Sequence, residues 1–113
     1  MQLGMPTLIF FTVNEMNTDI PENAVKYSES PVFTEVSIPD SLQRDHSTKP
    51  SVWGQIVVSS GALIYTRCNK PSQTIAAGET AIIHPEEPHN VAPKGAVNFK
   101  VEFYRVPKTE VAQ

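Results

Sequence analysis

Apolar and polar residues alternate along most of this chain, in short runs separated by proline and glycine. The longest run covers 97–106, where Val97, Phe99, Val101 and Phe103 alternate with polar residues. A period of two is typical of a β-strand with one buried face. Shorter runs of strand-forming residues occupy 32–38, 52–59, 62–67, 73–76, 80–84 and 89–92. We therefore expect roughly seven to nine short strands and an all-β fold.

Turn-forming residues lie between these runs. Ser60-Gly61 separates two apolar runs by two residues, which predicts a hairpin with a tight turn. Proline and glycine at 85–88 and 93–95 predict two more turns, and the polar stretch 41–51, which contains His46, predicts a loop. Turn signals at intervals of about eight to twelve residues are typical of β-sandwiches and barrels.

With 113 residues the chain has room for one domain with one core. We assign residues 1–20 to an N-terminal arm, 21–107 to a barrel domain and 108–113 to a C-terminal tail. The apolar run Leu8–Val13 in the arm is too short to span a bilayer. A signal peptide would require Lys or Arg before its apolar run, and none precedes this one. We expect no membrane partner.

Charge and cysteine content narrow the classes of function. The net charge is −3, and the nine Lys and Arg are spread from Lys26 to Lys108 without forming a basic patch. Because binding to nucleic acid depends on neutralising phosphates, we expect no nucleic-acid partner. The single cysteine, Cys68, excludes an internal disulfide and fits a cytoplasmic location. Since no glycine-rich phosphate-binding loop follows a strand, we also expect no nucleotide cofactor.

The segment GETAIIHPEEPHN, from Gly78 to Asn90, resembles the second motif of the cupins. In that motif a glycine, an apolar run and a proline-containing turn lead to a metal-ligating histidine. Gly78 and His89 stand at the matching spacing. The sequence departs from the motif at His84 and Glu86, which replace its proline and its second glycine.

A narrower resemblance, to the small cupin domain of the TehB/YeaR-like family, covers about 31–106. It rests on separated blocks that follow the family's order: PVFTE (31–35), DHSTK (45–49), VWGQIVV (52–58), HNV (89–91) and VEFYR (101–105). The resemblance implies a double-stranded β-helix, also called a cupin or jelly-roll barrel. It also implies a link to tellurite resistance or another stress response. In that family the domain occurs alone or in front of a methyltransferase, for which this chain is too short.

Cupins often bind a divalent metal inside the barrel, through histidines and one carboxylate. The first cupin motif normally supplies two histidines and a glutamate, but this chain has only His46 in that region and Gly54 at the approximate glutamate position. The resemblance therefore points to His46, His89 and Glu102 as ligands, provided that the polar face of the last strand points into the barrel. Such a set would suit Zn, Fe, Ni or Mn and would leave an open position for chemistry.

Three functions are compatible with these features. The function that we expect is a metal-binding cupin, which would bind a divalent metal and a small molecule or an oxyanion, with or without catalysis. A metal-free binding module would hold a ligand in the barrel mouth, and the incomplete first motif favours this alternative. A structural domain would form homodimers, with Leu8–Val13 adding a strand to the sheet edge of its partner. We expect a homodimer, and we interpret His84 as a structural residue.

Overall fold

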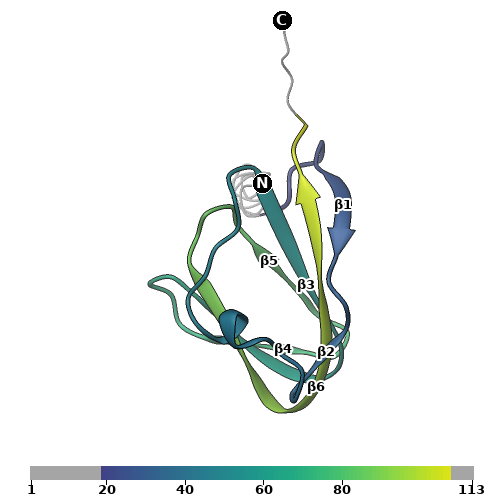
Figure 1. Cartoon of the computed structure of the whole chain (residues 1–113), viewed down its shortest axis with the longest axis vertical. Coiled ribbons are helices and arrows are strands. Elements are labelled where there is room, and N and C mark those ends of the chain that lie inside the picture. Colours follow the sequence, from purple (N-terminus) through teal and green to yellow (C-terminus); the bar gives the residue numbers. More distant parts are fainter. Residues whose placement is uncertain (1–18, 108–113) are drawn as a thin grey trace, which may run out of the picture.

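The computed structural model of the chain describes residues 19–107 (Figure 1). Two long strands, β3 (Val52–Arg67) and β6 (His89–Arg105), form its framework. Around them lie a 3-10 helix and four shorter strands: η1 (Asp40–Gln43), β1 (Val25–Glu29), β2 (Phe33–Thr34), β4 (Gln73–Ala76) and β5 (Thr80–Ile83). This part of the chain is all-β, as expected, and it contains no helix with the length and apolar character needed to cross a membrane. The predicted strand Leu8–Val13 and the tail 108–113 lie outside the described residues.

Strands β3 and β6 are antiparallel partners along nearly their whole length. Their register shifts twice near the middle of β3, once on either side of Ser60 and Gly61. Bulges of this kind bend a strand pair without ending it. Gly61 of β3 and Gly95 of β6 both have a φ of +72°, a conformation that glycine adopts at little cost. Figure 1 shows the consequence: β6 runs down one side of the barrel, bends, and returns up the other side.

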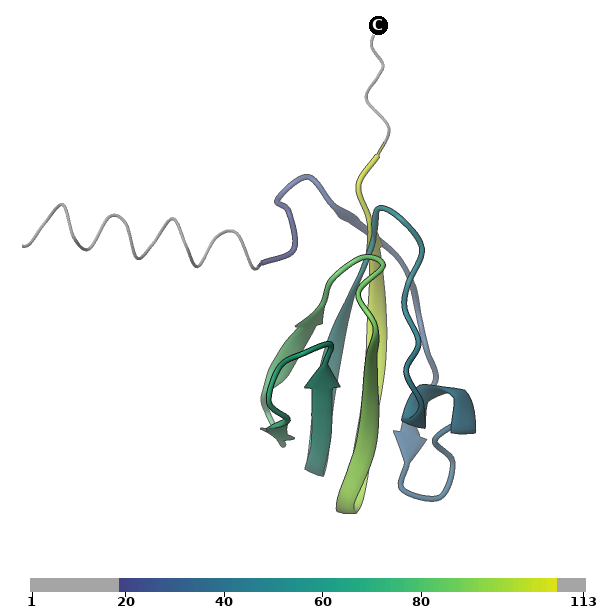
Figure 2. The same cartoon turned by 90° about the vertical axis from the view of Figure 1, so that its left-hand side faces the viewer.

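The bend divides each long strand into halves that belong to different layers of the barrel. Strand β5 pairs with 54–57 of β3, before the bend, whereas β4 pairs with 62–65, after it. Strands β1 and β2 pair with the last part of β6, at 102–105 and 98–99. Figure 2 shows β4 and β5 at one side of the barrel and β2 and η1 at the other, with β6 between them. The arrangement is the double-stranded β-helix that the resemblance implied.

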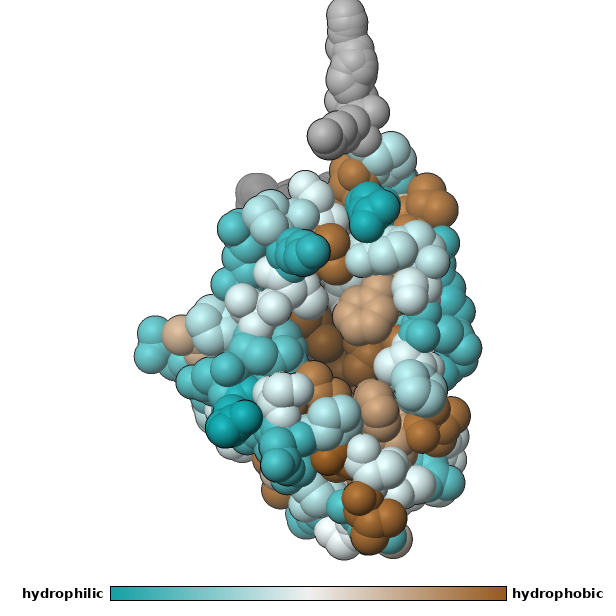
Figure 3. Space-filling model, viewed as in Figure 1, coloured by the Kyte–Doolittle hydropathy of each residue, from teal (hydrophilic) through white to brown (hydrophobic). Residues whose placement is uncertain are grey.

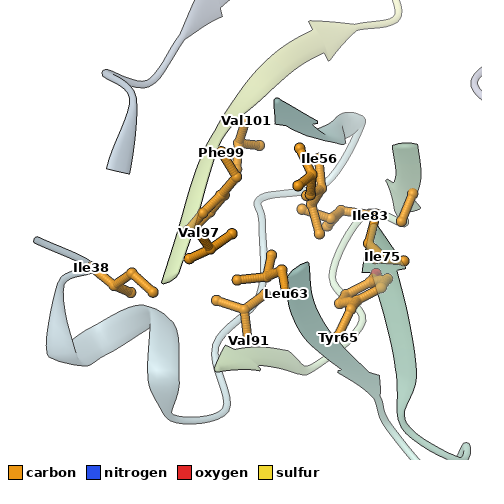
Figure 4. Packing of buried hydrophobic residues seen from close by; sticks show 12 residues of the cluster. Ile38, Ile56, Leu63, Tyr65, Ile75, Ile83, Val91, Val97, Phe99 and Val101 are labelled. Atoms are coloured by element: carbon orange, nitrogen blue, oxygen red, sulfur yellow. The ribbon is translucent and has the colours of Figure 1, made fainter. Parts of the chain in front are cut away.

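The core lies between the two layers (Figure 4). Both halves of β3 contribute to it, since Ile56 and Val58 before the bend and Leu63 and Tyr65 after it are each at most 1% exposed. The alternation predicted over 97–103 is confirmed, because its apolar face packs into this core. The other buried members are Ile38, Ile75, Ala81, Ile83, Val91, Val97, Phe99 and Val101.

The structure corrects two of the expected turns. No hairpin forms at Ser60-Gly61, because β3 continues through these residues, and the turn expected at 93–95 is the bend of β6. A bulge and a tight hairpin turn can both require a residue with positive φ, so glycine at position 61 does not distinguish between them. In place of the predicted hairpin and turn there are two long strands that pair with each other.

The shorter elements agree in part with the expected ones. Strand β4 covers the predicted run 73–76, and β5 covers all but the last residue of 80–84. Of the run 32–38, only Phe33–Thr34 is a strand, and Val36 is 87% exposed. Strand β1 was missed because all five of its residues are exposed, which leaves no buried face to produce alternation.

We expect Gly61→Ala to destabilise the fold far more than Gly95→Ala, although both glycines have the same φ. A Cβ at position 61 would stand 1.9 Å from the main-chain oxygen of Ala96, whereas a Cβ at position 95 would meet nothing within 4 Å. Gly95→Ala should cost about 1–2 kcal/mol for the left-handed backbone alone. Gly61→Ala should cost at least about 2 kcal/mol more, because backbone must move. Urea denaturation followed by circular dichroism measures both, and equal losses would contradict the close packing at the bend.

Candidate functional site

A cavity of about 340 Å³ opens between the barrel and the segment 39–51, which we call the strap. In Figure 3, which views the face that carries η1, a hollow with apolar atoms at its base lies near the centre. The strap provides half of the lining residues, and no Lys, Arg, Asp or Glu is among them. The residues that line the cavity are Ser30, Phe33, Pro39, Ser41, Leu42, His46, Ser47, Thr48, Ile83, His89, Val101 and Phe103.

An antiparallel bridge between His46 and His89 ties the strap to β6. The main-chain nitrogen of His46 donates to the oxygen of His89 at 3.0 Å, and the nitrogen of His89 donates to the oxygen of His46 at 2.9 Å. Beside this bridge the Asn90 amide donates to Asp45 Oδ1 at 2.7 Å. The two imidazole rings consequently lie with their centroids 4.2 Å apart. The structure therefore brings together the two histidines that the sequence placed in one site.

Hydrogen bonds to the main chain determine which nitrogen of each ring carries the proton. His46 Nδ1 lies 2.9 Å from the oxygen of Arg44, and His89 Nδ1 lies 3.0 Å from the oxygen of Glu87. Because a carbonyl oxygen can only accept, both Nδ1 atoms are donors, and Nε2 of each neutral ring is a free lone pair. Neither Nε2 has a protein partner within residues 19–107.

His89 is the more deeply buried of the two histidines. Its side chain is 2% exposed, and its ring contacts that of Tyr65 edge-on at a centroid distance of 5.9 Å. Burial lowers the pKa of His89 below its ordinary value, since the imidazolium would lose its hydration. The ring is therefore neutral at pH 7, with the lone pair on Nε2.

The structure does not bring Glu102 to the two histidines. Val101 and Phe103, its neighbours in β6, line the cavity, so the alternation of the strand directs Glu102 to the opposite face. There its carboxylate lies 3.3 Å from the amino groups of both Lys26 and Lys100. Burial alone would raise the pKa of Glu102, but hydrogen bonds from these lysines outweigh it and lower the pKa. The polar face of the last strand points outward because its apolar face forms the core.

The residues around the cavity do not fit a metal that needs three protein ligands. Among residues 19–107, no group of three or more His, Cys, Asp and Glu side chains is placed to hold a metal ion. The glutamate position of the first cupin motif, at about Gly54, cannot supply the missing ligand. Gly54 is buried, and a Cβ there would stand 3.0 Å from the side chain of Ile83. Ile83 thus occupies the space beside this position.

His84 belongs to a second polar cluster, which does not line the cavity. Arg67 donates from Nε and Nη2 to the two carboxylate oxygens of Glu87, at 2.8 and 3.0 Å, and Nη2 also lies 3.0 Å from His84 Nδ1. The ring of His84 meets that of Trp53 edge-on. Since the main-chain oxygen of Glu87 accepts the Nδ1 proton of His89, the cluster holds the turn that sets the tautomer of His89.

Sequence reasoning missed several residues of the site. Leu42 lines the cavity, and a signal for it exists, because it is the only large apolar residue in the polar stretch between Ile38 and Val52. The ion pair between Arg67 and Glu87 left no comparable signal. Arg67 is the last residue of β3 and Glu87 lies in the turn between β5 and β6, and from the sequence either could have been a solvated charge.

We expect Glu87→Gln to destabilise the fold by about 1 kcal/mol at pH 7 and by less at pH 3. The hydrogen bonds from Arg67 hold the pKa of Glu87 below its ordinary 4.5. The stability that the carboxylate contributes is therefore fully present above about pH 4.5 and is lost as the pH falls through the lower folded-state pKa. Urea denaturation between pH 3 and 8 measures the difference. The exposed neighbour Glu86 provides the control, since Glu86→Gln should change stability by less than about 0.5 kcal/mol throughout. A loss that is the same at pH 3 and pH 7 would count against the ion pair.

Comparison with solved structures supports the fold. A crystal structure of a protein from E. coli strain K12 matches with a TM-score of 0.75 at 23% sequence identity, covering 84% of this chain and 94% of that protein. TehB from Haemophilus influenzae matches with a TM-score of 0.70 at 21% identity, covering 75% of this chain and 32% of TehB. This chain thus spans about a third of TehB.

Comparison of the sequence identifies the family. No curated protein gave a match. The family model of the TehB-like domain, however, matches residues 28–101, which include β2 to β5, the strap and most of β6. The match contains both histidines of the bridge and more than half of the chain. The chain therefore belongs to the TehB-like domain family.

Proposed function

We propose that this chain is a binding domain for a small organic molecule, which it holds in the cavity between the strap and the barrel. The observation that carries the proposal is His89. It is 2% exposed, lines the cavity and has an Nε2 atom without a protein partner within residues 19–107. Leaving a buried polar group unpaired costs about 1–3 kcal/mol, and native proteins rarely do so. A bound molecule would supply the missing partner.

The size and wall of the cavity support the same proposal. Its volume of about 340 Å³ lies at the lower end of the range of roughly 300–1,000 Å³ that is typical of small-molecule sites. Its wall combines apolar side chains such as Phe33, Leu42 and Phe103 with a few polar groups, the usual composition of such sites. A compact molecule with an apolar body would fit this wall.

A divalent metal held by His46 and His89 is the competing proposal. Metal-ligating histidines usually donate their other ring N–H to a carbonyl or carboxylate, as Nδ1 of both residues does here. The pair supplies only two ligands, however, whereas zinc sites commonly use three or four from the protein. We favour the metal-free site because Glu102, the acid expected to complete the set, pairs with lysines on the other face of β6.

Membership of the TehB-like family supports a proposal for the cellular role of this binding. We propose that ligand binding by this domain serves tellurite resistance or another stress response in the cytoplasm. Because the chain spans about a third of TehB, we do not extend the activity of that longer protein to it. Formation of a homodimer stays a prediction, since Leu8–Val13 lies outside the described residues.

A binding experiment with cavity variants tests the proposed site. Toluene, phenol, anisole, benzoate and tellurite are titrated into the ¹⁵N-labelled chain, and amide shifts are followed by NMR. We expect at least one organic compound to shift amides that line the cavity, such as those of Leu42 and Val101. Leu42→Trp should abolish these shifts, because the indole would fill the cavity from η1. Gln43→Trp, at the next position of η1 but outside the cavity, should leave them unchanged.

Two results of that experiment would contradict the proposal: no shift with any organic compound, or equal shifts in Leu42→Trp. Metal analysis of the chain, purified without a tag, tests the competing proposal. One equivalent of metal that is lost in His89→Ala, with organic binding abolished by a chelator, would replace the metal-free site by a metal centre.

A further inference from the structure

Resting on the proposed binding site, we infer the chemical class of its ligand: a neutral, compact apolar molecule that carries a hydroxyl group, rather than an oxyanion. The inference follows from the hydrogen-bonding groups and the charges that the cavity offers to a bound molecule.

The two histidines present hydrogen-bond acceptors to the cavity. Both Nδ1 protons are donated to main-chain oxygens, at 2.9 Å for His46 and 3.0 Å for His89. In the neutral rings, Nε2 of each histidine is therefore an acceptor without a proton. The main-chain nitrogens of both residues are also engaged, since they form the bridge between strap and barrel. A ligand that pairs with this buried end of the cavity must bring its own hydrogen-bond donor.

The hydroxyl side chains of the cavity do not change this preference for a ligand that donates a hydrogen bond. Ser30 and Thr48 donate their protons to main-chain oxygens, at 2.8 and 2.7 Å, so neither has a proton left for a ligand. Ser41 and Ser47 are exposed residues of the strap. The hydroxyl donors left for a ligand thus belong to exposed residues, while the buried His89 offers an acceptor.

The charges around the histidines disfavour an anion. No lining residue is Lys or Arg, and Arg67, which pairs with His89 in the sheet, is occupied by both oxygens of Glu87. The charged groups whose fields reach His89 from the strap and the turn are His46, when its ring carries a second proton, and the carboxylates Glu87 and Asp45. A buried anion needs a paired cation or several donors. With both imidazole rings neutral, the lining side chains supply neither, whereas a neutral hydroxyl requires only an acceptor.

Phenol and anisole provide a matched test, because they share a ring and only phenol has an O–H donor. At pH 8 both phenol and imidazole are neutral. Titration of the full chain, followed by NMR, should show phenol binding about threefold to tenfold more tightly than anisole, the gain expected from one neutral hydrogen bond. Sodium tellurite should neither shift the cavity amides nor displace phenol.

Variants assign the difference to the histidine nitrogen. In His89→Phe the ratio of the two affinities should fall to about one, while anisole still binds. Tyr27→Phe, which removes a ring hydroxyl from an exposed residue outside the cavity, should keep the ratio of the unmodified chain. If His89→Phe does not fold, the unmodified chain provides the same test. 3-Fluorophenol, a stronger donor of nearly the same size, should bind more tightly than phenol, whereas 3-fluoroanisole should bind no more tightly than anisole.

The outcomes separate this inference from the proposed function. Equal affinities for phenol and anisole would overturn the inference that the ligand carries a hydroxyl group, but they would leave the proposed binding site in place. Displacement of phenol by tellurite would also overturn it, in favour of an oxyanion. Failure of every compound to shift the cavity amides would overturn the proposed function itself.

Discussion

The antiparallel pairing of β3 with β6 is the interaction on which the rest of this structure depends. Every shorter strand pairs with one of these two strands, and the core residues of both layers come largely from them. The register also decides which side chains face inward, because a slip by one residue would turn each apolar face of β3 and β6 to solvent. The bulges beside Gly61 let a single pair of strands serve both layers.

The candidate site also depends on the pairing of β3 with β6. His89 is the first residue of β6, and its main chain is free to pair outward because β3 occupies only its other side. The strap takes this place, and the bridge that joins it to the barrel also sets the two imidazole rings side by side. One pair of main-chain hydrogen bonds therefore closes the barrel mouth and builds the polar end of the cavity.

Local patterns predicted the elements whose cause is local. The alternation from Val97 to Phe103 reflects one strand with one buried face, and it was interpreted correctly. The same alternation already implied that Glu102 lies opposite the core. The expectation that it reaches the histidines required the polar face to point inward, which would have left Phe99 and Val101 in water. The expectation for Glu102 follows the family pattern and conflicts with this simple physical rule.

Features that depend on contacts distant in sequence could be predicted only through the family. Nothing local indicates that His46 and His89 share a bridge, and their meeting followed from the resemblance alone. Gly61 also shows why a local pattern does not predict a contact between distant strands. Its positive φ was foreseeable, but whether the chain reverses there or continues depends on the strand that lies alongside, and a sequence pattern does not contain that strand.

The bent strand pair has a consequence for how the molecule comes apart. In a sandwich made of two separate sheets, one sheet can fray while the other persists. Here each layer contains one half of β3 and one half of β6. Opening one layer would therefore displace strands that continue into the other layer. We therefore expect the barrel to unfold as a single cooperative unit, with the central main-chain amides of β3 and β6 exchanging with solvent only when the whole domain unfolds. The strap is joined to the barrel by isolated bridges and by the packing of Leu42 against the core, and we expect it to open at a lower free energy than the barrel itself.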